Sequence, residues 1–139
     1  MTSKLVEYFN KQPRLGILAT SGRDGRVDVA VIGSAHMTDE KTVVIGLAKN
    51  RTLAYLSENP HAVYMIVEPG KSIMDWKGVR VYFEAKEIAR HGPALEGLKD
   101  QIAKVAGKDA AAMMAAAVTF RVVEVRPLVD MGQGWEKSI

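Results

Sequence analysis

Residues 42–60 have the sequence TVVIGLAKNRTLAYLSENP, which combines a strand, a basic turn and a helix in one short stretch. The β-branched run over 42–48 predicts a buried strand. A helical pattern follows and ends at Asn59-Pro60. Lys49, Arg51 and the hydroxyl of Thr52 stand where this helix starts, and free N–H groups and the positive end of the helix dipole favour an anion there. The turn is therefore a predicted phosphate site, with a cofactor phosphate as the natural ligand.

The composition is that of an ordinary globular protein, with 139 residues, 47% hydrophobic residues and 25% charged residues. This length predicts a single domain covering residues 1–139. The net charge of +3 is spread along the chain, whereas nucleic-acid binders concentrate Lys and Arg on one face. The chain has no cysteine, which excludes disulfides, thiolate metal sites and a cysteine nucleophile.

No apolar run approaches the roughly 18 residues that a membrane-spanning helix needs. The amphipathic N-terminal segment carries Glu7 and does not resemble the apolar core of a signal peptide. The three histidines show no metal-ligand spacing, so no metal site is expected. We therefore expect a cytoplasmic protein that binds neither membrane nor nucleic acid.

The remaining elements follow from apolar periodicity and from turn residues. Leu5, Tyr8 and Phe9 predict a helix that Pro13 stops, and Asp24-Gly25 predicts a hairpin turn. A helix starts at Gly92-Pro93 and stops near Gly107, and 109–117 predicts a short second helix. The predicted strands cover 15–20, 27–35, 42–48, 61–67, 78–88 and 118–126. Six strands joined by short turns, without regular strand–helix alternation, indicate a mainly β fold with helices, arranged as an antiparallel barrel or sandwich.

The order of these elements resembles the pyridoxamine-phosphate-oxidase-like family of FMN-binding split barrels. Four features carry the resemblance: the opening helix with GILAT (16–20) and its hairpin, KNRT (49–52) with its helix, WKGVRV (76–81), and the strand 118–125 before Pro127. The resemblance covers about residues 3–128 and implies a six-stranded antiparallel split β-barrel. It also implies a homodimer with FMN held in a groove between the subunits.

The resemblance also assigns the candidate cofactor residues. The phosphate would be held by Lys49, Asn50, Arg51 and Thr52, and capping of the helix by Asn50 or Thr52 is compatible with that contact. The isoalloxazine ring would lie along the backbone of Ala30, Val31, Ile32, Gly33 and Ser34, where Gly33 allows close approach. Trp76 and Trp135 would stack near the ring or line the groove, and Lys77 would reach the ring or the phosphate across the interface.

The C-terminal segment lacks the Arg and His pattern by which pyridoxamine-phosphate oxidases bind substrate, so the resemblance implies a flavin-dependent oxidoreductase of unassigned substrate. No side chain stands out as a catalytic acid or base. Three alternatives stay open: a deazaflavin in place of FMN, a flavin electron carrier or sensor without turnover, and a dimeric interaction module without cofactor.

Overall fold

The computed structural model describes residues 3–139, and its strands form one antiparallel sheet. Its strands lie in the order β2-β1-β5-β6-β7-β4-β3. The strands are β1 Gly16–Ser21, β2 Val27–Val31, β3 His36–Asp39, β4 Thr42–Ala48, β5 His61–Glu68, β6 Lys77–Ala89 and β7 Met114–Pro127. The helices are α1 Lys4–Asn10, α2 Arg51–Glu58, α3 Pro93–Ala106 and α4 Lys108–Ala112, with single turns η1 Ile73–Asp75 and η2 Trp135–Ser138.

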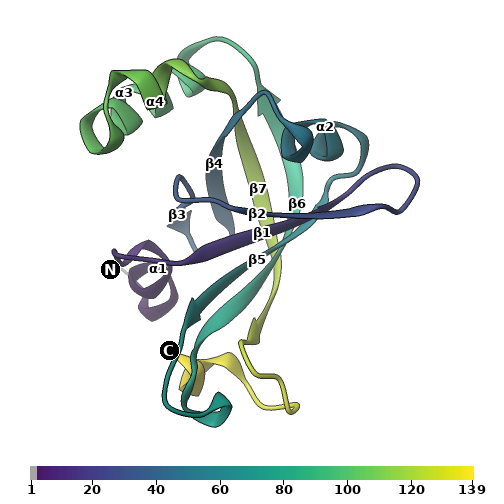
Figure 1. Ribbon diagram of the computed structural model, residues 1–139, viewed down its shortest axis with the longest axis vertical. Helices are drawn as coiled ribbons and strands as arrows, with labels where there is room; N and C mark the ends of the chain where they lie inside the picture. The colour runs from purple at the N-terminus through teal and green to yellow at the C-terminus, as the bar shows by residue number, and fades with distance from the viewer. Residues whose placement is uncertain (1–2) are drawn as a thin grey trace.

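The sheet is strongly curved, and its two end strands, β2 and β3, are consecutive in the chain (Figure 1). The prediction of six strands was wrong, because the described sheet has seven and is not closed into a barrel by hydrogen bonds. The predicted strand 27–35 is interrupted after Val31, and the chain resumes as β3 at His36. Thr38 and Asp39, which lie between the predicted strands 27–35 and 42–48, belong to β3.

Several local predictions are confirmed. The β1–β2 hairpin turns at Asp24-Gly25, where Gly25 has a φ of 85°. Helix α2 covers 51–58 as expected, and α3 begins at Pro93 and ends before Gly107. The second helix is shorter than predicted, since it stops at Ala112 and β7 starts four residues earlier than the predicted strand, at Met114.

The core lies inside the curve of the sheet. Alternate residues of β1, β5 and β6 point inward and are buried, as the two-residue period of a strand requires. Four aromatic rings, those of Phe9, Tyr64, Phe83 and Phe120, follow one another with centroids 5.3, 6.3 and 4.8 Å apart. This row of rings ties α1 to β5, β6 and β7, so the inner face of the sheet is held firmly.

Candidate functional site

The first turn of α2 carries the predicted phosphate-binding residues. Asn50 is the N-cap, and its side chain accepts a 3.1 Å hydrogen bond from the N–H of Leu53. Thr52 is buried, with 3% of its surface exposed, while Lys49 and Arg51 are exposed. This part of the sequence-based prediction therefore yields one compact group at a helix N-terminus.

This turn has unused hydrogen-bond donors and positive charge. The N–H of Ala54 donates to the carbonyl of Asn50, and the N–H of Leu53 donates to the Asn50 side chain. The N–H groups of Arg51 and Thr52 have no partner in residues 3–139. Neither Lys49 nor Arg51 forms an ion pair within that range, and no acidic residue lies in the first turn of α2. Such a turn suits an anion.

The segment between β2 and β3 contains the residues predicted to carry a flat ring. Ile32 continues the β1–β2 ladder, since its N–H donates to the carbonyl of Gly16 at 2.9 Å. Antiparallel ladders alternate, so the N–H and C=O of Val31 face the open edge of the sheet. The hydroxyl of Ser34 donates to the carbonyl of Gly46 at 2.8 Å and accepts from its N–H at 3.1 Å. The Ser34 side chain is therefore occupied, and only its backbone is available to a ligand.

Two residues that the sequence analysis missed, Arg14 and Tyr64, hold this segment from behind. The Tyr64 hydroxyl donates to the carbonyl of Ile32 at 2.7 Å. Arg14 Nη2 donates to the carbonyls of Gly33 and Ala35 at 3.0 and 2.8 Å. Burial raises the pKa of Tyr64, so its hydroxyl stays protonated and continues to donate at neutral pH.

The only sequence signals for these two residues are weak. Arg14 is a charged residue directly before a buried strand, and Tyr64 interrupts an otherwise aliphatic run at an inward-facing position of β5. Neither signal says which carbonyls the side chain would meet.

The helix turn and the 32–35 segment lie near each other through β4. Ser34 is hydrogen-bonded to Gly46, and Lys49 follows Gly46 by three residues, a span of at most about 11 Å. Ala30, at the end of β2, is half-buried on the inner side of the same strand. The structure thus brings the residues 30–34 and 49–52 into one region.

The other three predicted residues are not part of this region in one chain. Trp76 and Lys77 follow η1 in the connection between β5 and β6, and Trp135 begins η2. Both segments lie at the bottom of the molecule in Figure 1, whereas α2 lies near the top. Trp135 packs partly buried against the core.

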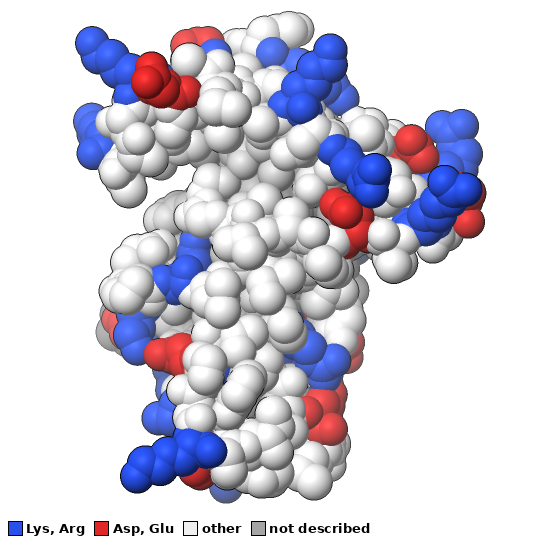
Figure 2. All heavy atoms as spheres, in the orientation of Figure 1, with Lys and Arg blue, Asp and Glu red and all other residues white. Residues whose placement is uncertain are grey.

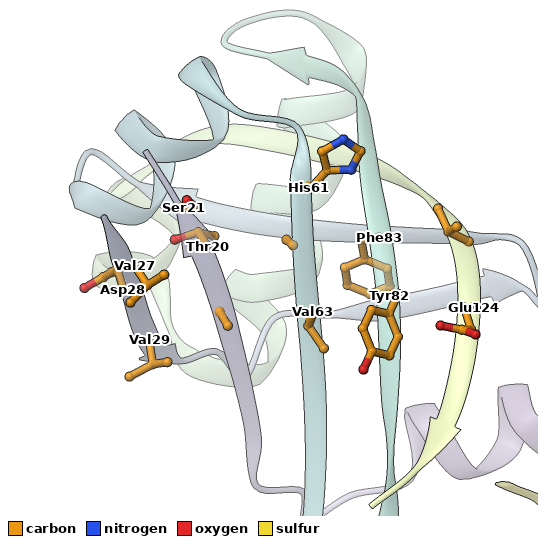
Figure 3. A pocket seen from close by; sticks show the side chains of 13 residues that line it. Thr20, Ser21, Val27, Asp28, Val29, His61, Val63, Tyr82, Phe83 and Glu124 are labelled. Carbon is orange, nitrogen blue, oxygen red and sulfur yellow. The ribbon is translucent and has the colours of Figure 1, made fainter. Parts of the chain in front are cut away.

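An open groove lies elsewhere, on the outer face of the sheet from β2 across to β7 (Figure 3). Ala19, Val29, Val63 and Tyr82 form one row across neighbouring strands of this face. Val27, His61 and Glu124 also line the groove. None of the sequence-predicted cofactor residues lines it, so the groove and the α2 turn are separate features of the single chain.

The same outer face is unusually apolar at its edge. Val27, Val29 and Val31 of β2 are 79%, 69% and 73% exposed. Figure 2 shows few charged side chains over the centre of the molecule, where β1 and β2 cross in front in Figure 1. Three exposed valines on an end strand form a surface that favours contact with another protein surface.

Within residues 3–139, no group of three or more His, Cys, Asp or Glu side chains is arranged to hold a metal ion. None of the described helices combines the length and the apolar character that crossing a membrane requires.

Comparisons with known proteins agree with this fold. The family model described as pyridoxamine 5'-phosphate oxidase matches residues 1–129. A search of the curated proteins found no match. The structure is similar to that of an FMN-binding protein from Syntrophomonas wolfei subsp. wolfei, with a TM-score of 0.76, 21% identity, and coverage of 92% of this chain and 84% of that chain.

Two further similar structures are of proteins with other named ligands. HutZ of Vibrio cholerae, named as a heme storage protein, has a TM-score of 0.66 and 18% identity, with 98% of this chain and 99% of that chain covered. An F420 reductase has a TM-score of 0.64 and 14% identity, with 89% and 98% covered. At these identities the likeness shows the fold alone.

Proposed function

The chain belongs to the pyridoxamine 5'-phosphate oxidase family, and from this premise we propose that it is an FMN-binding flavoprotein that acts as an oxidoreductase. The observation that carries the proposal is the first turn of α2. It combines two cations without ion-pair partners, two backbone N–H groups without acceptors in residues 3–139, and the side chain of Thr52. A phosphate group satisfies all of these donors at once.

The residues present fit FMN in two parts. Lys49, Arg51 and Thr52 hold the phosphate, with Asn50 fixing the helix start. The segment 30–34 supplies a backbone surface for the ring. When bound, a flavin supplies hydride or electron transfer, while the protein positions it and sets its electrostatic surroundings.

We also propose that the functional unit is a homodimer with the cofactor at the interface. The exposed valines of β2 supply an apolar contact surface next to the 32–35 segment. Trp76, Lys77 and Trp135 lie far from the α2 turn in one chain and reach a cofactor there only from a second subunit (Figure 1). The open groove of Figure 3 then becomes part of the contact region between two copies.

A deazaflavin is the second candidate ligand, because the phosphate turn recognises the phosphate and not the ring. The similarity to an F420 reductase supports keeping it as a candidate. A carrier or sensor without turnover and a cofactor-free dimeric module are the remaining candidates. Nothing in the site identifies a substrate, and no side chain is assigned as a catalytic acid or base.

The test is the identity of the ligand that co-purifies with the protein. We expect a yellow preparation whose released ligand has the mass of FMN, and a protein that, once stripped, binds FMN more tightly than riboflavin. A colourless preparation that ignores added FMN would contradict the proposal, and a released deazaflavin would replace FMN by the second candidate. If FMN binds, reduction by NAD(P)H with a substrate screen separates an oxidoreductase from a carrier.

A further inference from the structure

The break between β2 and β3 has a specific cause in hydrogen bonding. In a continuous strand, the carbonyl of Ile32 would point toward β1, while those of Gly33 and Ala35, like that of Val31, would point to the open edge. Here the Tyr64 hydroxyl donates to the carbonyl of Ile32. Arg14 donates to the carbonyls of Gly33 and Ala35. Three acceptors of one short segment are therefore taken by this pair of side chains, and the N–H of Gly16 does not pair with the carbonyl of Ile32.

The position of the carbonyls determines the direction of the neighbouring N–H groups. In a trans peptide unit, the C=O of one residue and the N–H of the next point in opposite directions. Because the carbonyl of Ile32 points toward Tyr64, the N–H of Gly33 points away from it. The carbonyl of Gly33 points toward Arg14, so the N–H of Ser34 points away in the same manner. Neither N–H has a hydrogen-bond partner in residues 3–139.

We propose that Arg14 and Tyr64 are positioning residues for the cofactor ring, because they turn the 32–35 segment so that its N–H groups, and not its carbonyls, face the ring. This inference rests on the proposed function and adds to it the polarity of the surface that contacts the ring. A surface that presents two successive donors selects a ring edge that carries acceptors, such as the carbonyl-bearing edge of a flavin or a deazaflavin.

Arg14 is itself held firmly, which makes it suited to this role. Its guanidinium lies over the rings of Phe9 and Tyr64, 5.4 and 5.6 Å from their centroids. Its second terminal nitrogen donates to the carbonyl of Phe9 at 2.6 Å. The planar guanidinium of Arg14 donates to three carbonyls at once, whereas a lysine ammonium in the same place would lack that fixed geometry.

The experiment compares FMN with riboflavin, which has the ring but no phosphate, in Tyr64→Phe, Arg14→Lys and Arg51→Ala. Tyr64→Phe keeps the buried ring and removes only the hydroxyl, so it tests the inference even if Arg14→Lys fails to fold. We expect Tyr64→Phe to weaken both ligands by the same factor, about three- to tenfold, and Arg14→Lys to weaken both by about tenfold or more. Arg51→Ala should weaken FMN alone.

The control is Tyr8→Phe, which removes another tyrosine hydroxyl that is hydrogen-bonded, in this case to Glu68 rather than to a carbonyl of the 32–35 segment. Its affinities for both flavins should equal those of the wild type. Melting curves of all variants check that each one is folded.

A second readout separates positioning from mere loosening of the structure. N–H donors facing the ring stabilise the negative charge that reduction adds, so Tyr64→Phe should lower the reduction potential of the bound flavin. If the substitution weakens binding of the two-electron-reduced flavin tenfold more than binding of the oxidised flavin, the reduction potential falls by about 30 mV. Weaker binding with an unchanged potential would overturn the positioning role.

The outcomes distinguish this inference from the proposed function. If Tyr64→Phe and Arg14→Lys bind riboflavin like the wild type while Arg51→Ala loses FMN, the inference fails and the proposed function stands. If the wild-type protein binds neither flavin, the proposed function fails and the inference fails with it.

Discussion

Tyr64 lies directly over Gly16, so closely that its phenol ring and hydroxyl occupy the space that a side chain at position 16 would need. The same hydroxyl hydrogen-bonds to Ile32, while the ring packs between those of Phe9 and Phe83. Gly16 is therefore required by the residue that holds the candidate ring-binding segment. This relationship connects the packing of β1 and β5 with the geometry of the site.

We expect Gly16→Ala to lower the free energy of unfolding by about 2 kcal/mol or more, because the added Cβ would collide with Tyr64, which is fully buried between Phe9 and Phe83. Urea denaturation measures the effect. The matched variant is Gly33→Ala, whose added Cβ meets no atom within 4 Å and should change stability by less than about 0.5 kcal/mol. Equal stability of the two variants would contradict the assigned contact.

Gly97 lies in the middle of α3, and a Cβ added there meets no atom within 4 Å. Gly97→Ala should therefore raise the free energy of unfolding by about 0.4–1 kcal/mol, since alanine loses less backbone entropy on folding. The midpoint of the same urea transition reports the gain. A lower midpoint would mean that α3 is not helical at this position in solution.

Arg51 is the guanidinium at the α2 turn. We expect Arg51→Ala to weaken FMN binding by tenfold or more, which corresponds to the loss of about 1.5–3 kcal/mol for a hydrogen bond to a charged group. A flavin titration measures the change. Lys104→Ala, which removes an exposed charge from the last turn of α3, serves as the control and should bind FMN normally. An unchanged affinity in Arg51→Ala would exclude Arg51 from the phosphate site.

The valines of β2 test the proposed dimer. We expect Val27→Lys combined with Val29→Lys to weaken self-association by about two orders of magnitude, because each lysine would have to be buried at the contact. Analytical ultracentrifugation over a range of concentrations measures this. Val105→Lys is the control, since Val105 is 89% exposed on α3, far from β2 in the fold (Figure 1). A double variant that sediments like the wild type would place the interface elsewhere.

Glu68 should contribute to a loss of stability in acid. Its hydrogen bond from Tyr8, aided by the charge of Lys11, holds the pKa of Glu68 below its ordinary value of 4.5. A carboxyl whose pKa is lower in the folded state stabilises the fold above the unfolded-state pKa, and this contribution is lost as the pH falls through the folded-state pKa.

The wild-type Tm should therefore fall more steeply than that of Glu68→Gln between about pH 5 and pH 3. Glu40→Gln, in the exposed β3–β4 turn, should instead follow the wild type. Parallel Tm curves for wild type and Glu68→Gln would show that the Tyr8–Glu68 contact is not maintained in solution.

The sequence was informative wherever the structure depends on neighbours in the chain. The helix of 51–58 follows from its N-cap, its periodicity and Asn59-Pro60, and the hairpin follows from Asp24-Gly25. To predict that Lys49, Arg51 and Thr52 stand together at a helix start, it was enough to recognise a strand followed directly by a helix. These features involve interactions over a few residues, so the local pattern contains the necessary information.

Contacts between distant residues decided what the sequence pattern missed. The apolar run 27–35 predicts one strand, yet it breaks after Val31, where Tyr64 binds the carbonyl of Ile32 and Arg14 binds those of Gly33 and Ala35. Tyr64 is 32 residues from Ile32 in sequence, and periodicity does not reveal such a pair. The sequence by itself determined the helix turn and the strand pattern, because those are local. Only the tertiary structure decided where the sheet is interrupted and which backbone groups the interruption leaves free, because a carbonyl pairs with whichever donor the packed core brings to it.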